Sequence, residues 1–301
     1  MPDDYDVLLP GGYYCDLIFT GLPELPRLGA DLFGTGFDMV PGACFYTVLA
    51  LHRLGLRVGW ACDFGDDCYS RFVLDAAARE GIDDRLFRLH ARPLRRVSVS
   101  FSFAHDRGFI SYKDEFASPS PIPIIERYRP RCLLLSYLHV GPQLHTLAAT
   151  THAYGGLVYM DCQARPETLA DPQVVAAIRA IDIFAPNREE ALQLTGASSV
   201  EVALARLAEL VPLAVIKLGA EGAVARRGDQ VAHAPGIPVA VVDTTGAGDC
   251  FNAGFLYGYL RGMALEDCLR RGNICGGLAT AARGCGATPT AAQVEEMSYE
   301  F

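Results

Sequence analysis

Short apolar runs of strand length recur along the chain and alternate with stretches of helical periodicity. The apolar runs are Val7–Leu9, Val58–Cys62, Cys132–Leu138, Leu157–Met160, Ile181–Ala185, Leu213–Lys217 and Val239–Val242. Between them, residues 71–80 and 200–210 have helical spacing and stop at Gly81 and before Pro212, which are typical helix ends. Strands that are apolar on both faces and alternate with helices predict an α/β fold, with a mostly parallel sheet covered on both sides.

One segment does not fit the interior of such a sheet. Residues 97–103 alternate strictly between apolar and serine side chains. This period of two predicts a strand with one buried apolar face and one wet face. The strand fits either a small antiparallel element that projects from the main domain, or an edge strand of the main sheet.

Composition narrows the class of protein. With 301 residues, half of them hydrophobic, residues 1–301 are expected to form a single large α/β domain. A net charge of −9, with no Lys/Arg run longer than a pair, argues against nucleic acid or an anionic membrane as partner. The acidic N-terminus and the lack of a membrane-spanning apolar stretch lead us to expect a cytoplasmic location. The ten cysteines include no Cys-x-x-Cys pair, so we expect buried free thiols and no zinc site.

The segment after Val239–Val242 carries the clearest chemical signal. Its order predicts a strand, then the small-residue turn Asp243–Asp249, then a helix over residues 250–256. Gly246 and Gly248 allow the backbone to approach a ligand closely, and amides at the start of a helix attract an anion. Asp249 lies in the first helical turn, beside that anion. The segment predicts a phosphate cradle next to a carboxylate, a combination suited to phosphate transfer onto a hydroxyl.

Other motifs have simple structural explanations when each is taken alone. There is no Walker A sequence, and Gly34-Thr35-Gly36 lacks the third glycine of a dinucleotide fingerprint. Asn187 and Glu190 follow Pro186 with the spacing of a capping box. Residues 217–222 have the pattern of a strand, a glycine turn and a second strand, as in a hairpin.

The order of these motifs resembles the PfkB family of carbohydrate kinases. Residues 243–255 resemble its C-terminal signature, residues 187–190 its Asn-x-x-Glu motif, and residues 217–222 its nucleotide-side glycine turn. Its N-terminal signature is matched by Gly42, Leu54-Gly55, Gly59 and residues 63–67. The resemblance covers the chain from about Leu8 to Thr290. It implies a ribokinase-like fold, a three-layer α/β/α sandwich with a mostly parallel central sheet and a small β-sheet lid.

The resemblance implies an ATP-dependent phosphotransferase that acts on a hydroxyl of a small sugar or polyol. Asp249 matches the general base of the family, and the amides of Gly246, Ala247 and Gly248 match its anion hole. The residues implied to organise Mg²⁺ or flank ATP are Asn187, Glu190, Lys217, Gly219, Gly222 and Asn273. The alternatives are a nucleoside kinase of the same family and a catalytically idle ligand-binding member.

A monovalent-cation site, for potassium, is also implied by the resemblance. The matching residues are Asp243, Thr245, Ala279, Gly286 and Thr290. The match is partial, because residues 283–287 carry one residue more than the usual pattern.

The expected substrate side departs from the family pattern. Gly12, Asp16 and Gly42 match positions that bind sugar hydroxyls. Tyr46, however, stands where the family usually has an asparagine, and Pro41 where it has a glycine. The larger phenol puts an ordinary ribose or fructose substrate in doubt and would suit a stacking face or a more distant polar group.

The resemblance implies a lid that closes over the sugar. In the family this lid often forms a dimer interface, so we expect a homodimer. Its strands are expected within residues 7–19, 32–39 and 97–112. The aromatic residues expected to exclude water there are Phe33, Phe37, Phe101, Phe103, Phe109 and Tyr112.

Overall fold

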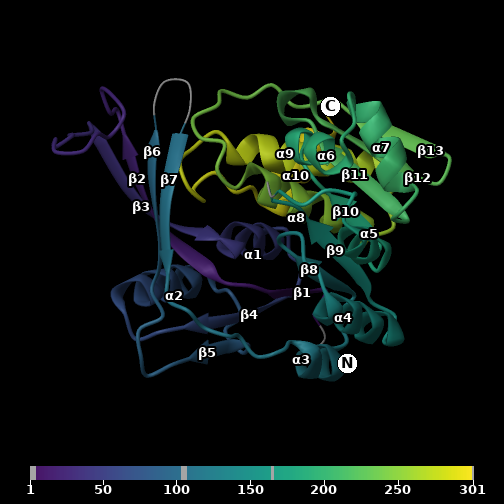
Figure 1. Cartoon of the computed structure of the whole chain (residues 1–301), viewed down its shortest axis with the longest axis horizontal. Helices are drawn as coiled ribbons and strands as arrows, with labels where there is room; N and C mark the ends of the chain where they lie inside the picture. Colours follow the sequence, from purple (N-terminus) through teal and green to yellow (C-terminus); the bar gives the residue numbers. More distant parts are fainter. Residues whose placement is uncertain (1–4, 103–106, 164–165, 300–301) are drawn as a thin grey trace.

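The computed structural model describes residues 5–102, 107–163 and 166–299. Phe103, which the sequence analysis assigns to the lid, lies outside these residues. The described chain forms two sheets with helices on both sides of the larger one (Figure 1).

The larger sheet is mostly parallel, as predicted. Its nine strands, in spatial order, are β13 (Gln230–Ala234), β12 (Ala223–Arg227), β11 (Leu213–Lys217), β10 (Ile183–Ala185), β9 (Leu157–Asp161), β8 (Cys132–Leu135), β1 (Val7–Pro10), β4 (Val58–Phe64) and β5 (Phe87–Leu89). Every neighbouring pair from β11 to β5 is parallel, whereas β12 and β13 add an antiparallel hairpin at one edge. The hairpin expected from residues 217–222 is β11–β12.

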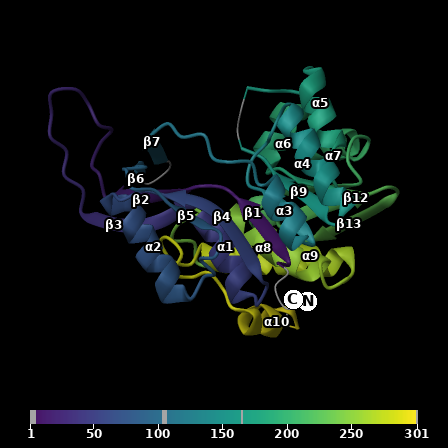
Figure 2. The ribbon, with the colours of Figure 1, turned by 90° about the horizontal axis from the view of Figure 1, so that it is seen from below.

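Helices cover both faces of this sheet, because its strands are apolar on both faces. Val7 and Leu9 of β1 pack into one core and Leu8 into the other. The first core includes α1 (Cys44–Arg53), α2 (Cys68–Glu80), α8 (Ala247–Tyr259), α9 (Leu265–Ala279) and α10 (Ala291–Ser298). The second includes α3 (Ile122–Tyr128), α4 (Pro142–Ala153), α5 (Pro172–Arg179), α6 (Arg188–Thr195) and α7 (Val200–Ala208). Figure 2 shows the two helical layers, so the three-layer sandwich is confirmed.

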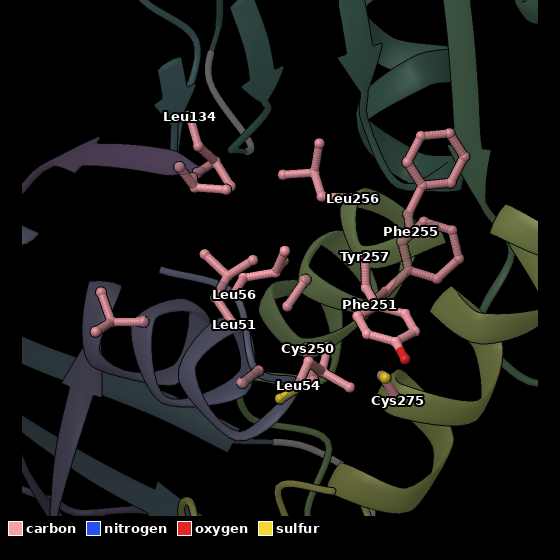
Figure 3. Close-up of a cluster of buried hydrophobic side chains, with 14 of the residues drawn as sticks. Leu51, Leu54, Leu56, Leu134, Cys250, Phe251, Phe255, Leu256, Tyr257 and Cys275 are labelled. Carbon is pink, nitrogen blue, oxygen red and sulfur yellow. The ribbon is translucent and has the colours of Figure 1, made fainter. Parts of the chain in front are cut away.

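Helices α1 and α8 pack against each other in the first core. Figure 3 shows the end of α1 at Leu51 and Leu54 beside Cys250 and Phe251 of α8, with Cys275 of α9 close by. These side chains are almost fully buried, and apolar burial contributes about 25 cal/mol per Å². The contact fixes the start of α8 relative to α1, which matters for the site described below.

The second sheet is the projecting element expected from the alternating strand. Its order is β3 (Gly36–Ala43), β2 (Tyr13–Thr20), β6 (Arg96–Ser102) and β7 (Arg107–Lys113). The sheet stands beside the main body in Figures 1 and 2. Two of its pairs are antiparallel, but β2 and β6 run parallel. The alternative of an edge strand in the main sheet is therefore wrong.

The two faces of β6 are reversed with respect to the sequence-based expectation. Ser98 and Ser100 are buried, whereas Val97 and Val99 are partly exposed. Ser98 Oγ lies 2.9 Å from Ser111 Oγ of β7, and this hydrogen bond satisfies polar groups that burial would otherwise penalise. The apolar face of this sheet is therefore its outer face.

Two further expectations differ from the structure at the edges of this sheet. Val7–Pro10 pairs with β4 and β8 in the main sheet, where its side chains are buried on both faces, and the small sheet begins only at Tyr13. Residues 32–35 precede β3 and form no strand.

The strand expected at Val239–Val242 is absent from the described residues, because the hairpin β12–β13 already occupies this edge of the main sheet. Val241 and Val242 are more than half exposed. The segment is instead fastened to the end of α9, where the amides of Val242 and Asp243 both donate to the carbonyl of Thr280.

Candidate active site

A cavity of about 830 Å³ opens where the carboxyl ends of the central strands meet the small sheet. Residues from the N-terminal half line one side: Gly12, Tyr13, Tyr14, Ala43, Cys44, Arg96, Lys113, Ser136 and Tyr137. Residues from the C-terminal half line the other side: Asp161, Cys162, Gln163, Asn187, Arg188, Glu189, Glu190, Lys217, Leu218, Gly219, Glu221, Gly248 and Asp249. A cavity at the carboxyl ends of parallel strands is where α/β sheets bind ligands.

Asp249 lies in the wall of this cavity, in the first turn of α8. Its Oδ1 accepts a hydrogen bond of 2.7 Å from Thr47 Oγ1 of α1. Burial raises the pKa of Asp249 to about 6, and the bond from Thr47 acts in the opposite direction. The carboxyl is therefore held in place and titrates close to neutral pH, as a general base requires.

The glycine turn before α8 has the geometry of an anion cradle. Gly246 has a left-handed φ of 76°, and a Cβ there would lie 2.5 Å from the Tyr46 ring. The amide of Ala247 donates to the carbonyl of Thr244, so it is engaged within the turn. Within the described residues, the amides of Gly246 and Gly248 have no backbone acceptor. These two amides, at the positive end of the helix dipole, are free to bind an anion.

Lys217 brings a positive charge to the same turn. A Cβ on Gly248 would lie 3.4 Å from Lys217 Nζ, so the ammonium lies next to the cradle. Lys217 Nζ donates to Asp161 Oδ1 at 2.6 Å, and Asn252 Nδ2 of α8 donates to Asp161 Oδ2 at 2.6 Å. The hydroxyl of Tyr159 completes the network by donating to Asn252 Oδ1. This buried network ties β9, β11 and α8 together beneath the cavity.

Asn187 and Glu190 form the capping box of α6 that their spacing predicts. Asn187 Oδ1 accepts from the amide of Glu190, and Glu190 Oε2 accepts from the amide of Asn187. Burial raises the pKa of Glu190 to about 7, and the nearby charge of Asp161 adds to this. Asn187 and Glu190 both line the cavity, and they carry an amide oxygen and a carboxylate, which are donor types that Mg²⁺ binds.

The remaining residues expected near a nucleotide occupy two positions. Gly219 lines the cavity, and both Gly219 and Gly222 have left-handed φ. Gly222 packs so closely on the carbonyl of Ala234 that a Cβ would lie 2.1 Å from it. Asn273 is buried in α9 and donates to the carbonyls of Ala234 and Pro235. Asn273 therefore orders the segment behind Gly222 and does not line the cavity.

On the opposite side, Gly12 lines the cavity, and Asp16 and Gly42 contact each other across β2 and β3. A Cβ on Gly42 would lie 2.0 Å from Asp16 Oδ2, so only glycine leaves room for the carboxylate. Burial raises the pKa of Asp16 to about 7, with a further contribution from Asp243. Their expected contacts with substrate remain predictions.

Tyr46 occupies a different place from the one its motif position predicts. Its ring is 2% exposed, packs against Gly246, and is not among the described residues that line the cavity. Its hydroxyl is buried without a hydrogen-bond partner in the described structure. Burial and the neighbouring carboxylates of Asp16 and Asp243 raise its pKa. Tyr46 therefore supports the glycine turn from below.

Replacing Tyr46 with phenylalanine is expected to stabilise the protein. An unpaired buried hydroxyl costs about 1–3 kcal/mol, and Tyr46→Phe removes it while keeping the ring against Gly246. Thermal denaturation should therefore show a higher Tm. Steady-state kinetics should show unchanged KM values for ATP and for the acceptor. Tyr159→Phe is the matched control and should lower Tm, because that hydroxyl is bonded to Asn252. A lower Tm for Tyr46→Phe would contradict the assignment.

The five residues expected to bind a monovalent cation are only partly brought together. Asp243 Oδ1 accepts from both the amide and the hydroxyl of Thr245. Ala279 ends α9 beside Thr280, whose carbonyl holds the amide of Asp243. Gly286 lies in the loop before α10, and Thr290 caps that helix with its side chain engaged by Gln293. A role for potassium remains a prediction.

Three residues of the site, Thr47, Asp161 and Asn252, were missed by the sequence analysis. Thr47 directly follows Tyr46, and Asn252 lies within the matched C-terminal signature, so their positions offered a signal. Asp161 ends an apolar run at the carboxyl edge of the sheet, where functional carboxylates gather.

No helix in the described part of the chain is long and apolar enough to cross a bilayer. The cysteines expected to be free thiols are confirmed as such, and all but Cys68 and Cys285 are buried.

Comparison with known proteins agrees with this geometry. The model of the pfkB family carbohydrate kinases matches residues 131–292. The chain is 30% identical over 264 residues to a fructokinase of Klebsiella pneumoniae, covering 81% of this chain and 86% of that protein. A shorter match, 45% identical over 92 residues, covers 30% of this chain and 36% of an uncharacterized sugar kinase of Archaeoglobus fulgidus.

Among solved structures, a double mutant of the Vibrio cholerae O395 fructokinase, bound to fructose, ADP and potassium ion, superposes with a TM-score of 0.78. It is 25% identical, and the match covers 98% of this chain and 99% of that one. The family model, the relative covered over most of its length and the fold all agree. The chain therefore belongs to the PfkB family of carbohydrate kinases.

Proposed function

We propose that this sugar kinase transfers the γ-phosphate of ATP to a hydroxyl of a small sugar or polyol, with Asp249 as general base. The observation that carries the proposal is Asp249 itself: a carboxylate in the cavity wall, held by Thr47, with a pKa of about 6 beside an anion cradle. It is mostly ionised at neutral pH and ready to accept the proton of an attacking hydroxyl.

The other residues act on the phosphates in this proposal. Negative charge on the transferring phosphoryl group is stabilised by the amides of Gly246 and Gly248 and by the ammonium of Lys217. Such donors are effective because they are already in position before the reaction. Asn187 and Glu190 would hold Mg²⁺, which would neutralise charge on the phosphates. Gly219 and Gly222 would shape the nucleotide side of the cavity. Asp243 and Thr245, which are bonded to each other, would hold a potassium ion that orders the turn.

A coupled assay with ATP and Mg²⁺ over neutral sugars, polyols, sugar acids, sugar phosphates and nucleosides tests this proposal. We expect turnover with at least one sugar or polyol derivative, faster when K⁺ is present. Turnover confined to nucleosides would replace the sugar assignment. Absence of phosphoryl transfer to every acceptor, with ATP or GTP, would favour an idle ligand-binding member of the family.

The activity should fall at acidic pH because the base must be ionised. A pKa of about 6 for Asp249 predicts that its contribution to kcat/KM is full well above this pH and is lost below it. Asp16 and Glu190 titrate near 7, so the limb belongs to several groups, and a variant is needed to isolate Asp249. Thr47→Val removes the bond that lowers the pKa of Asp249 and should move the limb to higher pH.

The measurement is the pH profile of kcat/KM for the unmodified enzyme and for Thr47→Val. Thr151→Val is the matched control, because Thr151 is equally buried but donates to the carbonyl of Leu147 in α4. An unchanged limb in Thr47→Val would argue against Asp249 as the titrating base.

We also propose that two copies pair through the outer faces of their small sheets. The strand register places Phe37, Phe19 and Phe101 in one row and Met39, Leu17, Val99 and Ile110 in the next, all on that face. Phe37 is 57% and Ile110 66% exposed. Contiguous apolar surface of this kind is typical of interfaces. Light scattering should give the mass of a dimer, and Phe37→Glu with Ile110→Lys the mass of a monomer.

A cytoplasmic location is proposed as well. The support is the set of ten free cysteines, which suits a reducing compartment.

A further inference from the structure

We infer that the sugar acceptor carries an anionic group, a carboxylate or a phosphate, which is bound between Arg96 and Lys113 of the small sheet. The inference rests on the proposed function, because it assigns the chemical class of the molecule that the kinase phosphorylates.

Arg96 and Lys113 are direct neighbours that face the same cavity. They are paired residues in the antiparallel register of β6 and β7, and both line the cavity that contains Asp249. Cβ atoms of directly paired residues lie about 4.5–5.5 Å apart, and like charges at this spacing destabilise a sheet. Two cations side by side therefore need an anion between them.

The described residues do not supply that anion. In the described structure, neither Arg96 nor Lys113 has an ion pair, whereas the other cations of the cavity do. Lys217 is paired with Asp161 at 2.6 Å, and Arg188 with Glu221 at 2.7 Å. Among the described residues that line the cavity, Arg96 and Lys113 are thus the positive charges without an ion-pair partner.

Arg96 is held in position although it lacks a carboxylate partner. Its guanidinium lies 5.6 Å from the centre of the Tyr13 ring and packs directly on Gly12. A Cβ on Gly12 would lie 1.5 Å from Nη1, so glycine is what admits the side chain. Arg96, Gly12 and Tyr137 also line a second cavity of about 520 Å³, so the guanidinium stands at the junction of the two. A half-buried guanidinium at such a junction is placed to bind a ligand.

The position favours the acceptor over the phosphates of ATP. Arg96 and Lys113 lie on the same face of the small sheet as Asp16, and they line the cavity together with Gly12 and Tyr14. The nucleotide motifs are in the C-terminal half, where Lys217 already lies beside Gly248. A planar guanidinium binds a carboxylate or phosphate through two parallel hydrogen bonds, and an ammonium adds a point charge.

Matched acceptors test the inference. D-gluconate is compared with D-glucose, and fructose 6-phosphate with fructose, so the two comparisons also separate a carboxylate from a phosphate. We expect kcat/KM to be at least about 10-fold higher for a charged member of one pair. Charged hydrogen bonds of this kind predict that Arg96→Gln lowers kcat/KM for that acceptor by about 10- to 100-fold and Lys113→Gln by less, with the KM for ATP unchanged.

Arg95→Gln is the matched control. Arg95 directly precedes Arg96, and the same substitution of arginine by glutamine can be made there. Its guanidinium is paired with Asp114 outside the cavity. It should leave kcat/KM unchanged. Gly12→Ala should act like Arg96→Gln, because the added methyl group displaces the guanidinium.

Two results would overturn the inference while leaving the proposed function intact. One is turnover of the neutral sugars with kcat/KM equal to or above that of their charged partners. The other is an Arg96→Gln enzyme in which only the KM for ATP rises, which would assign the guanidinium to the nucleotide. If no acceptor of any charge is phosphorylated, the proposed function itself fails.

Discussion

Asp249→Asn is expected to reduce kcat by about 10²- to 10⁴-fold, the usual contribution of a general base. The amide keeps the shape of the carboxylate and can still accept the bond from Thr47, but it cannot take up a proton. Binding of ATP should persist, since Lys217 and the glycine turn are unchanged. Steady-state kinetics and calorimetric titration with a non-hydrolysable ATP analogue are the measurements.

Asp229→Asn is the control for this substitution. Asp229 is exposed in the turn between β12 and β13 and is not among the described residues that line the cavity, so its variant should have normal kcat. An Asp249→Asn enzyme with near-normal turnover would refute the role of the carboxylate. Loss of ATP binding in the same variant would indicate damage to the turn and not loss of the base.

Lys217→Met is expected to have the largest effect on stability. Lys217 and Asp161 form a buried pair, with side chains 11% and 9% exposed, and removing one member leaves the other charge uncompensated. Such a change costs about 3–5 kcal/mol, which lowers Tm by about 5–15 °C in a protein of this size. Thermal denaturation, monitored by circular dichroism, measures the effect.

A second variant distinguishes this cause from loss of packing. Lys217→Met combined with Asp161→Asn removes both charges and should be more stable than Lys217→Met alone, because no isolated charge remains. Arg270→Met is the control, since the side chains of the Arg270–Asp267 pair are 33% and 41% exposed and such a pair should contribute at most about 1 kcal/mol. A double variant as unstable as the single one would contradict the electrostatic explanation.

The fold could be predicted because its strands and motifs carry local signals. The apolar runs at Cys132 and Leu213 become strands, and Gly81 ends α2 in the left-handed conformation. Val239–Val242 was misassigned because an apolar run does not reveal whether a neighbouring strand is present. The faces of β6 were reversed for a related reason. Ser98 is buried against Ser111 of the neighbouring strand β7, and the pattern within β6 alone does not reveal this partner.

The candidate site was predictable where one short segment holds the chemistry, as at Gly246–Asp249 or Asn187–Glu190. It was not predictable where the chemistry depends on contacts between distant residues. Thr47 meets Asp249 across 202 positions, and Asp161 meets Lys217 across 56. The motif position of Tyr46 suggested a ligand contact, but its packing against Gly246 was visible only in three dimensions.

The direct join between the small sheet and helix α1 limits how the acceptor side can be exchanged between relatives. Strand β3 ends at Ala43, which takes a left-handed φ of 53°, and α1 begins at Cys44 with no intervening loop. The same helix carries Thr47, which holds the base. A chimaera that imports the small sheet of another kinase as a cassette would therefore have to import α1 with it, or misplace Asp249. Acceptor preference and catalytic alignment are in this way inherited as one unit.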